Sequence, residues 1–219
     1  MSTSSSSSAG ATIAPGRHYS RYSKKRKGLF YYAYVDYLVR RLAAEARSII
    51  DVGSHDVSLL EQFDWIERRT SLDLQRPYSS PRVEGVQADF FSYEPARRFD
   101  FAICLQVLEH VPDAQAFARK LLKTARNVLV SVPYRWPANS NPHHCHDPVD
   151  ETKLALWFGR MASYELIVEE PLRDRGKARR LISYYQDEAD PFDIRRFRTP
   201  KPQRPGAPSF ASVREGDAQ

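Results

Sequence analysis

Apolar residues follow two different periodicities along this chain, and the alternation between them indicates the fold class. A four-residue repeat opens the pattern and predicts a helix with one apolar stripe, formed by Phe30, Tyr34, Leu38 and Leu42. The aromatic run at 30–37 is interpreted as core packing plus a lid. Two more helices are expected, one at 114–124 behind an Asp113 cap and one at 152–158.

Short runs rich in apolar and β-branched residues lie between these helical stretches and predict strands. The expected strands cover 48–53, 70–74, 85–89, 99–105 and 127–132. Two later runs, at 164–168 and 181–185, are joined by a segment too charged and too short for a crossover helix, so they are expected to pair antiparallel. Together these elements predict an α/β domain built on a mostly parallel sheet.

The distribution of charge separates a core from two tails. The chain has 219 residues and a formal net charge of +6, but residues 29–170 carry a net charge of −4. The basic excess lies in 17–28 and 171–219. We therefore expect a Ser-rich and then basic disordered tail at 1–28, one domain at 29–190, and a Pro-rich disordered tail at 191–219. An acidic core disfavours nucleic acid as a partner.

The sequence shows neither a secretory leader nor a membrane-spanning segment, and this bears on where the protein is located. The chain opens on a serine tract with neither a basic leader nor an apolar segment, and it has no apolar run long enough to span a bilayer. Cys104 and Cys145 are its only cysteines. We therefore expect a cytoplasmic protein whose thiols stay reduced.

Carboxylates stand at the ends of the first three expected strands, where open α/β sheets bind their ligands. Asp51 precedes Gly53, which allows a sharp turn, and Asp73 follows that glycine by 20 residues, a spacing suited to binding both ribose hydroxyls. Asp89 could accept the exocyclic amine of adenine, with Phe90 against the ring. The pattern predicts an adenosine site. Dinucleotides and nucleoside triphosphates are disfavoured, because neither G-x-G-x-x-G nor G-x-x-x-x-G-K-[ST] is present.

These stretches resemble the class I S-adenosylmethionine-dependent methyltransferases of the small-molecule type. The matching segments are SIIDVGSHDVSLL, TSLDLQ, VQADFF, FDFAICLQVLEHVPD and NVLVSVPYRWP. They span residues 49–137, and the final strand pair agrees with the antiparallel ending of the family. The resemblance implies a Rossmann-like methyltransferase sheet with an antiparallel final strand, helices on both faces, and S-adenosylmethionine as the cofactor.

The resemblance also implies a set of cofactor-binding residues. They are Asp51, Gly53 and Ser54 near the methionine part, Asp73 on the ribose, Asp89 and Phe90 around adenine, and Leu105 and Gln106 alongside the cofactor; the adjoining His55 and Leu74 are assigned to the same site. The chain departs from the family at two positions. His55 and Val57 stand where the family usually has glycines.

Methyl transfer to a hydroxyl benefits from a base, and imidazole suits that role near neutral pH. His110, just after the fourth strand, is one candidate, although it could equally be a helix-start residue bonded to the backbone. His146, held by Asp147, is the other. The loop around it could instead be a plain surface loop, with Asp147 and Pro148 starting the next helix.

The same loop is expected to help bind the acceptor. The candidate substrate-binding residues are Tyr134, Trp136, His143 and His144. A metal site is conceivable, since His, Cys and Asp are all ligands. None is predicted, because near-adjacent residues diverge in direction and no second cluster of ligands lies elsewhere in the chain.

The leading hypothesis is therefore a methyltransferase acting on a small molecule or sugar, more readily at oxygen than at nitrogen. A nucleic-acid methyltransferase is disfavoured, because the position of its [DNS]-P-P-[YFW] element holds Leu105-Gln106-Val107-Leu108. A non-catalytic binding module on the same scaffold is the third alternative.

Overall fold

The structure is a computed structural model that describes residues 26, 28–190 and 192–193. The two expected tails, 1–28 and 191–219, lie almost wholly outside the described residues. Among the described helices, none combines the length and the apolar character needed to cross a bilayer.

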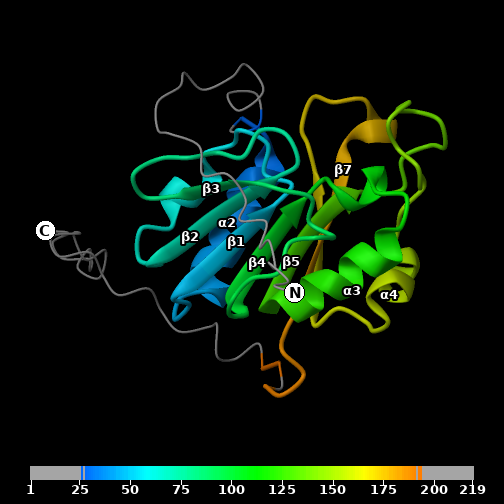
Figure 1. Cartoon of the computed structure of the whole chain (residues 1–219). Helices are drawn as coiled ribbons and strands as arrows, with labels where there is room; N and C mark the ends of the chain where they lie inside the picture. The colour runs from blue at the N-terminus through cyan, green and yellow to red at the C-terminus, as the bar shows by residue number, and fades with distance from the viewer. Residues whose placement is uncertain (1–25, 27, 191, 194–219) are drawn as a thin grey trace, which may run out of the picture.

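A seven-stranded sheet forms the centre of the molecule (Figure 1). Its strands are β1 (Ser48–Val52), β2 (Arg68–Asp73), β3 (Glu84–Gln87), β4 (Phe99–Leu105), β5 (Ala125–Pro133), β6 (Tyr164–Glu169) and β7 (Arg179–Tyr185), in the spatial order β3-β2-β1-β4-β5-β7-β6. The first five strands run parallel, whereas β7 pairs antiparallel with both β5 and β6. The expected mostly parallel sheet with an antiparallel ending is confirmed.

Helices cover both faces of this sheet, as predicted (Figure 1). One face packs against α3 (Ala114–Thr124) and α4 (Glu151–Phe158), and the other packs against α2 (Phe30–Leu42) and the 3₁₀ turn η1 (Leu59–Gln62). Side chains alternate along each strand, so Ala102 and Cys104 face the first layer while Phe101 and Ile103 face the second. This two-sided burial explains why the strands are continuous apolar runs.

The buried face of α2 differs from the stripe that the sequence predicts. The helix has the expected bounds, but Phe30 and Tyr34 are 51% and 37% exposed. Its buried residues are Tyr31, Tyr32, Val35, Leu38 and Val39. Phe30 and Tyr34 instead contact each other, with ring centroids 5.7 Å apart. The prediction was wrong by one position at the start of the helix, because aromatic residues occupy both its buried and its exposed positions.

The N-cap predicted for α3 is confirmed, whereas the start predicted for α4 is wrong. The Asp113 carboxylate accepts a hydrogen bond of 2.9 Å from the Ala116 N–H and caps α3, as expected. The carboxylate of Asp150 caps α4 by accepting from the Lys153 N–H at 3.0 Å. Asp147 and Pro148 therefore do not begin this helix, because they belong to the loop before it.

The order of the strands positions the ligand site. Strand β1 lies between β2 and β4, so the chain leaves the centre of the sheet in one direction after β1 and returns on the other side with β4. Loops that follow such a reversal separate and leave a crevice at the carboxyl ends of the strands.

Candidate cofactor pocket and adjoining histidine network

A pocket of about 430 Å³ opens at this crevice. The loops after β1 to β4 and the start of α3 form it. Its lining residues are Val52, Gly53, His55, Leu72, Asp73, Leu74, Ala88, Asp89, Phe90, Phe91, Gln106, Val107, His110, Val111, Pro112 and Phe117. Its walls are mainly apolar, and the described residues that form them include two carboxylates and neither Lys nor Arg.

The turn after β1 requires glycine at position 53. Gly53 has a φ of +76°, in the left-handed region, and its N–H donates a hydrogen bond of 2.8 Å to the Leu72 carbonyl. A Cβ at this position would lie only 2.5 Å from Cγ2 of Val107. Both the backbone conformation and the packing therefore exclude a side chain here.

His55 adopts a left-handed conformation where the family usually has glycine. Its φ is +49°, and its N–H donates to Oδ2 of Asp73 at 2.9 Å. The His55 Nδ1 lies 2.8 Å from Oδ1 of Asp56. The turn thus keeps a glycine-like backbone although its residue carries an imidazole, which lines the pocket.

Asp73 holds the neighbouring loops together at the end of β2. Its Oδ1 accepts from the N–H groups of Gln75 and Arg76 at 2.8 and 2.9 Å, while Oδ2 accepts from His55. The carboxylate is therefore fixed in orientation on the pocket wall, beside the turn at Gly53. Oδ2 accepts only one of these hydrogen bonds, so it keeps a second lone pair with which to accept a ligand hydroxyl.

The third strand ends earlier than expected, so Asp89 lies in the loop after it. Its Oδ1 accepts from the Phe91 N–H at 2.9 Å, and its side chain lines the pocket. Phe90 also lines the pocket, with its ring 4.6 Å from that of Phe117. An exposed carboxylate beside a fixed aromatic ring suits a planar base that carries an amine.

Gln106 is fixed just beyond β4. It has a φ of +58°, its N–H donates to the Ser131 carbonyl at 2.8 Å, and its Nε2 donates to the Ser131 hydroxyl at 3.2 Å. The side chain is buried and lines the pocket.

Three of the expected cofactor residues do not line the pocket. The Ser54 hydroxyl lies 2.6 Å from that of Ser71, and Leu105 packs into the core on the α2 side of the sheet. Asp51 is buried at the end of β1, where desolvation and the nearby Asp73 carboxylate raise its pKa to about 8. A buried carboxyl of this kind is neutral at pH 7 until a cation comes near it.

The two candidate bases occupy different surroundings. His110 lines the pocket and its Nδ1 donates to the His143 carbonyl at 2.8 Å, while burial lowers its pKa. His146 lies outside the pocket lining, where its Nε2 donates to the Val111 carbonyl at 2.8 Å and its ring contacts Trp157. Of the two, only His110 reaches the pocket.

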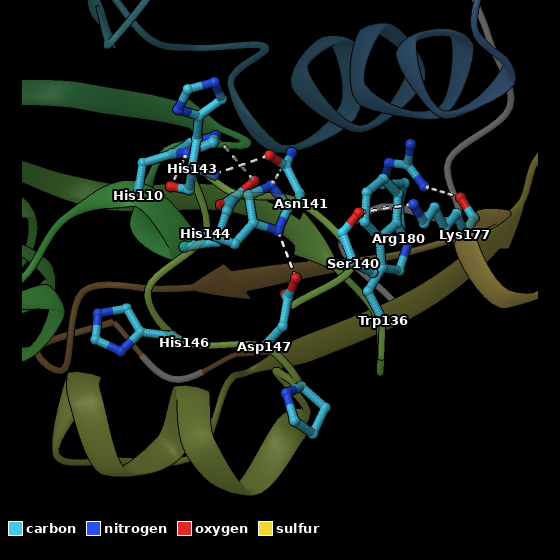
Figure 2. A network of polar contacts seen from close by, with 12 residues as sticks. His110, Trp136, Ser140, Asn141, His143, His144, His146, Asp147, Lys177 and Arg180 are labelled. Carbon is cyan, nitrogen blue, oxygen red and sulfur yellow. Dashed lines mark hydrogen bonds and ion pairs between the residues drawn. The ribbon is translucent and has the colours of Figure 1, made fainter. Parts of the chain in front are cut away.

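Asp147 pairs with His144 and not with His146, which corrects the sequence prediction. The His144 Nδ1 lies 2.6 Å from Oδ2 of Asp147, and both side chains are buried (Figure 2). The Asn141 amide contacts the His144 Nε2 at 2.9 Å. The loop turns back on itself between Asn141 and Asp147, so sequence adjacency does not determine which side chains meet.

The residues expected to bind the acceptor lie beside the pocket and do not line it. Trp136 stacks on His144 with ring centroids 5.5 Å apart, and His144 packs edge-on against His110 at 4.7 Å. Tyr134 is buried, and the exposed His143 contributes its carbonyl to His110.

Among the residues that sequence reasoning missed, Val107 and Glu109 have the clearest structural roles. Val107 fills the space above Gly53, and Glu109 is buried at 1% exposure beside the histidines. Burial raises the pKa of Glu109 to about 8. The signal available in the sequence was the Leu-Glu-His triplet itself, a charged residue directly after an apolar strand.

Comparisons with known proteins by sequence and by structure find methyltransferases. No protein-family model matches the chain. It is 28% identical over 182 residues to the ubiquinone biosynthesis O-methyltransferase of Xanthomonas axonopodis pv. citri (strain 306), covering 65% of this chain and 75% of that protein. The corresponding enzyme of Xanthomonas oryzae pv. oryzae (strain PXO99A) is 27% identical over 180 residues, with the same coverage.

Solved structures match the fold over most of the chain. The 1,6-didemethyltoxoflavin-N1-methyltransferase of Burkholderia thailandensis, with bound S-adenosylhomocysteine, aligns with a TM-score of 0.59 at 16% identity, covering 82% of this chain and 95% of that one. The N-methyltransferase NodS of Bradyrhizobium japonicum WM9, also in complex with S-adenosylhomocysteine, gives 0.57 at 10% identity, covering 75% and 91%. The chain has the class I S-adenosylmethionine-dependent methyltransferase fold, and the resemblance found in the sequence is confirmed.

Proposed function

We propose that this chain is a class I S-adenosylmethionine-dependent methyltransferase that transfers the sulfonium methyl group to an oxygen atom of a small molecule. The observation that carries the proposal is the pocket at the carboxyl ends of β1 to β4, with Asp73 and Asp89 on its wall and Gly53 in its turn. These groups match an adenosine with its ribose. S-Adenosylmethionine is an adenosine that carries a cationic sulfonium, which suits a pocket whose described lining has two carboxylates and neither Lys nor Arg.

The cofactor would be held by groups that are already oriented. Asp73 is fixed by three backbone N–H donors and presents its carboxylate for the ribose, while Asp89 and Phe90 lie where adenine would fit. Asp51 lies buried behind the lining residues Val52 and Gly53, so a cationic methionine ammonium in the pocket would favour the ionised form of its carboxyl through the field and not by direct contact. Such fixed positions lower the entropy cost of alignment, and alignment supplies most of the acceleration in an in-line displacement.

The reaction itself needs few groups. The acceptor oxygen attacks the methyl carbon from the side opposite sulfur, and the carbon–sulfur bond breaks with its electron pair going to sulfur. The products are a methyl ether, S-adenosylhomocysteine and a proton. His110 lies on the pocket wall with its Nδ1 already donating to the His143 carbonyl, so its Nε2, which makes no hydrogen bond among the described residues, would take that proton.

Oxygen is favoured over nitrogen as the acceptor atom on two grounds. The curated relatives carry names of O-methyltransferases, and imidazoles gather beside the pocket, where a neutral hydroxyl needs help to lose its proton. The fold does not discriminate, because the structural neighbours include N-methyltransferases. A phenol, a catechol or a sugar hydroxyl fits this chemistry.

Isothermal titration of the full chain with S-adenosylmethionine and S-adenosylhomocysteine tests the cofactor assignment. We expect saturable binding of both, and no binding at millimolar cofactor would reject the proposal. A methyl-transfer assay over matched hydroxyl and amine acceptors then tests the acceptor atom. Binding without transfer to any acceptor would favour a non-catalytic module instead, and transfer to amines alone would reject oxygen.

A further inference from the structure

Arg180 is a buried cation without an acidic hydrogen-bond partner. It lies at the start of β7 and is only 4% exposed. Its Nη1 donates to the carbonyls of Lys177 and Arg179 at 2.9 and 3.0 Å. Its Nε is buried, and neither Nε nor Nη2 makes a hydrogen bond among the described residues. A buried charge is costly unless it is paired, so this guanidinium indicates an anion that lies outside the described residues.

The acidic side chain that attracts Arg180 is already occupied. The carboxylate of Glu170 accepts hydrogen bonds of 2.8 and 2.9 Å from the N–H groups of Phe30 and Tyr31, and so caps the start of α2. Burial lowers the pKa of Arg180, and the positive charge of Arg26 acts in the same direction. Glu170 therefore does not neutralise this part of the molecule.

Further hydrogen-bond donors lie around the guanidinium. The Ser140 hydroxyl is buried and makes no hydrogen bond within the described part of the chain. Lys177 uses one of its three ammonium hydrogens, in a 2.7 Å bond from Nζ to the Ser140 carbonyl. The ring of Trp136 lies 4.6 Å from the guanidinium carbon of Arg180 and 6.0 Å from Nζ of Lys177. Figure 2 shows these four side chains together, at the junction of the loop after β5 with the start of β7.

A chain of ring contacts connects this group to the cofactor pocket. Trp136 stacks on His144 with centroids 5.5 Å apart, and His144 packs against His110 at 4.7 Å. His110 lines the pocket where methyl transfer is proposed. Two rings thus separate Arg180 from the reaction site. An acceptor whose hydroxyl lies at His110 and whose body extends along these rings would bring its far end to Arg180.

We propose that Arg180, Lys177 and Ser140 bind an anionic oxygen group, a carboxylate or a phosphate, that the methyl acceptor carries. This inference rests on the proposed function, and it names the class of acceptor. The Nε and Nη2 edge of a guanidinium matches two oxygens of either anion, and such bidentate pairs are among the strongest hydrogen bonds in proteins. The hydroxyl and the ammonium supply the further donors. A neutral acceptor leaves the buried cation unpaired, so the site selects for charge.

Calorimetric titration of the full chain, with S-adenosylhomocysteine present, tests the preference for an anion. The probes are catechol, 3,4-dihydroxybenzoate and 3,4-dihydroxyphenyl phosphate, which share the two hydroxyls and differ in charge. We expect at least one of the anionic probes to bind more tightly than catechol by about tenfold or more. The tighter of the two identifies the group as a carboxylate or a phosphate. Absence of saturable binding for both anionic probes would overturn the proposal, and so would equal affinity for all three.

Substitutions at Arg180 separate recognition of the anion from a structural role. Arg180→Met should abolish the preference and leave the affinity for catechol unchanged, whereas a structural role would lower the affinity for all three probes alike. Arg180→Lys keeps the charge without the planar fork, so it should recover only part of the preference. Arg179→Gln is the matched control: Arg179 is the exposed neighbour, pairs with Glu169 at 3.2 Å and should not affect the preference. A preference that survives in Arg180→Met would overturn the assignment.

Two further measurements keep the possible failures apart. Circular dichroism of each variant establishes that a loss of binding is not a loss of folding. Titration with S-adenosylhomocysteine alone reports on the cofactor pocket, so absence of that binding counts against the proposed function. The anionic probes are therefore also titrated without cofactor, where loss of their binding in Arg180→Met but not in Arg179→Gln would support the anion site by itself.

Discussion

The Nδ1 of His144 donates a hydrogen bond of 2.6 Å to Oδ2 of Asp147, and the two side chains are only 4% and 2% exposed. This pair lies directly beside His110, whose ring contacts that of His144. A short hydrogen bond in a buried setting fixes the imidazole in one orientation. The pair therefore orders the loop after β5, which the chain composition alone would suggest to be a polar surface loop.

Asp147→Asn should destabilise the protein, because it removes a charged acceptor from a buried donor. We expect a loss of about 1–3 kcal/mol in the free energy of unfolding, measured by denaturant titration. Asp64→Asn, at an exposed loop position, serves as the control and should change little. Equal stability of the two variants would show that the pair does not order the loop.

Gly53→Ala should lower both stability and cofactor affinity. The left-handed conformation alone costs an alanine about 1–2 kcal/mol. Gly159→Ala is a matched control, since its φ is +74° but its nearest neighbouring atom would lie 3.9 Å away, at Arg119. Any loss in Gly53→Ala beyond that of Gly159→Ala reports the clash with Val107. Adding Val107→Ala should recover part of that excess, and no recovery would contradict the packing argument.

Asp73→Asn should weaken binding of S-adenosylmethionine at least tenfold. The asparagine offers one acceptor oxygen where the carboxylate now serves three N–H donors and, as proposed, the ribose hydroxyls. Calorimetric titration measures the change. Parent-like affinity would remove Asp73 from the cofactor site, and a parallel titration of Asp64→Asn guards against a general effect of charge.

The stability of the unliganded protein should fall as pH rises from about 4 to about 8. Burial raises the pKa of Asp51 from 3.8 to about 8, so between these values the folded state holds a proton that the unfolded state has released. Burial acts on Glu109 in the same direction. Asp51→Asn and Glu109→Gln should each flatten the dependence, measured by denaturant unfolding across this pH range. If both variants kept the pH dependence of the parent, the raised pKa values of these two buried carboxyls would be contradicted.

His110→Asn and His146→Asn should differ in their effect on turnover. His110 lines the pocket, so its loss should lower kcat by about 10²–10⁴-fold, the usual contribution of a proton acceptor. His146 lies outside the lining and donates to the Val111 carbonyl, so its loss should cost much less. Steady-state kinetics with a responsive acceptor measures both, and a larger effect at His146 would restore it as the base.

Features that depend on the chemistry of neighbouring residues could be predicted from the sequence. Continuous apolar runs mark strands that are buried on both faces, and the position of Gly53 after Asp51 follows from the need for a sharp turn. Asp73 and Asp89 could be placed on the pocket because strand ends in a parallel sheet share one edge.

Other features depend on side-chain directions that no periodicity encodes. Tyr31 and Phe30 are both aromatic neighbours in α2, but only Tyr31 faces the core. In the loop after β5, backbone turns decide which imidazole meets Asp147, and adjacency in the sequence suggested His146 wrongly. Glu109 was passed over because its burial follows from the packing of two loops that are distant in the sequence.

Three hydrogen bonds of 2.8 Å join the segment after β4 to the loop after β5. The Cys145 N–H donates to the Glu109 carbonyl, His110 donates to the His143 carbonyl, and His146 donates to the Val111 carbonyl. The segment after β4 lines the cofactor pocket, and the loop after β5 contains the residues beside which the acceptor would bind. Because these hydrogen bonds connect the two segments, binding of the cofactor should alter the affinity for the acceptor, and binding of the acceptor should alter the affinity for the cofactor by the same factor. Because this coupling is symmetric, it would act to the same extent whichever of the two ligands binds first.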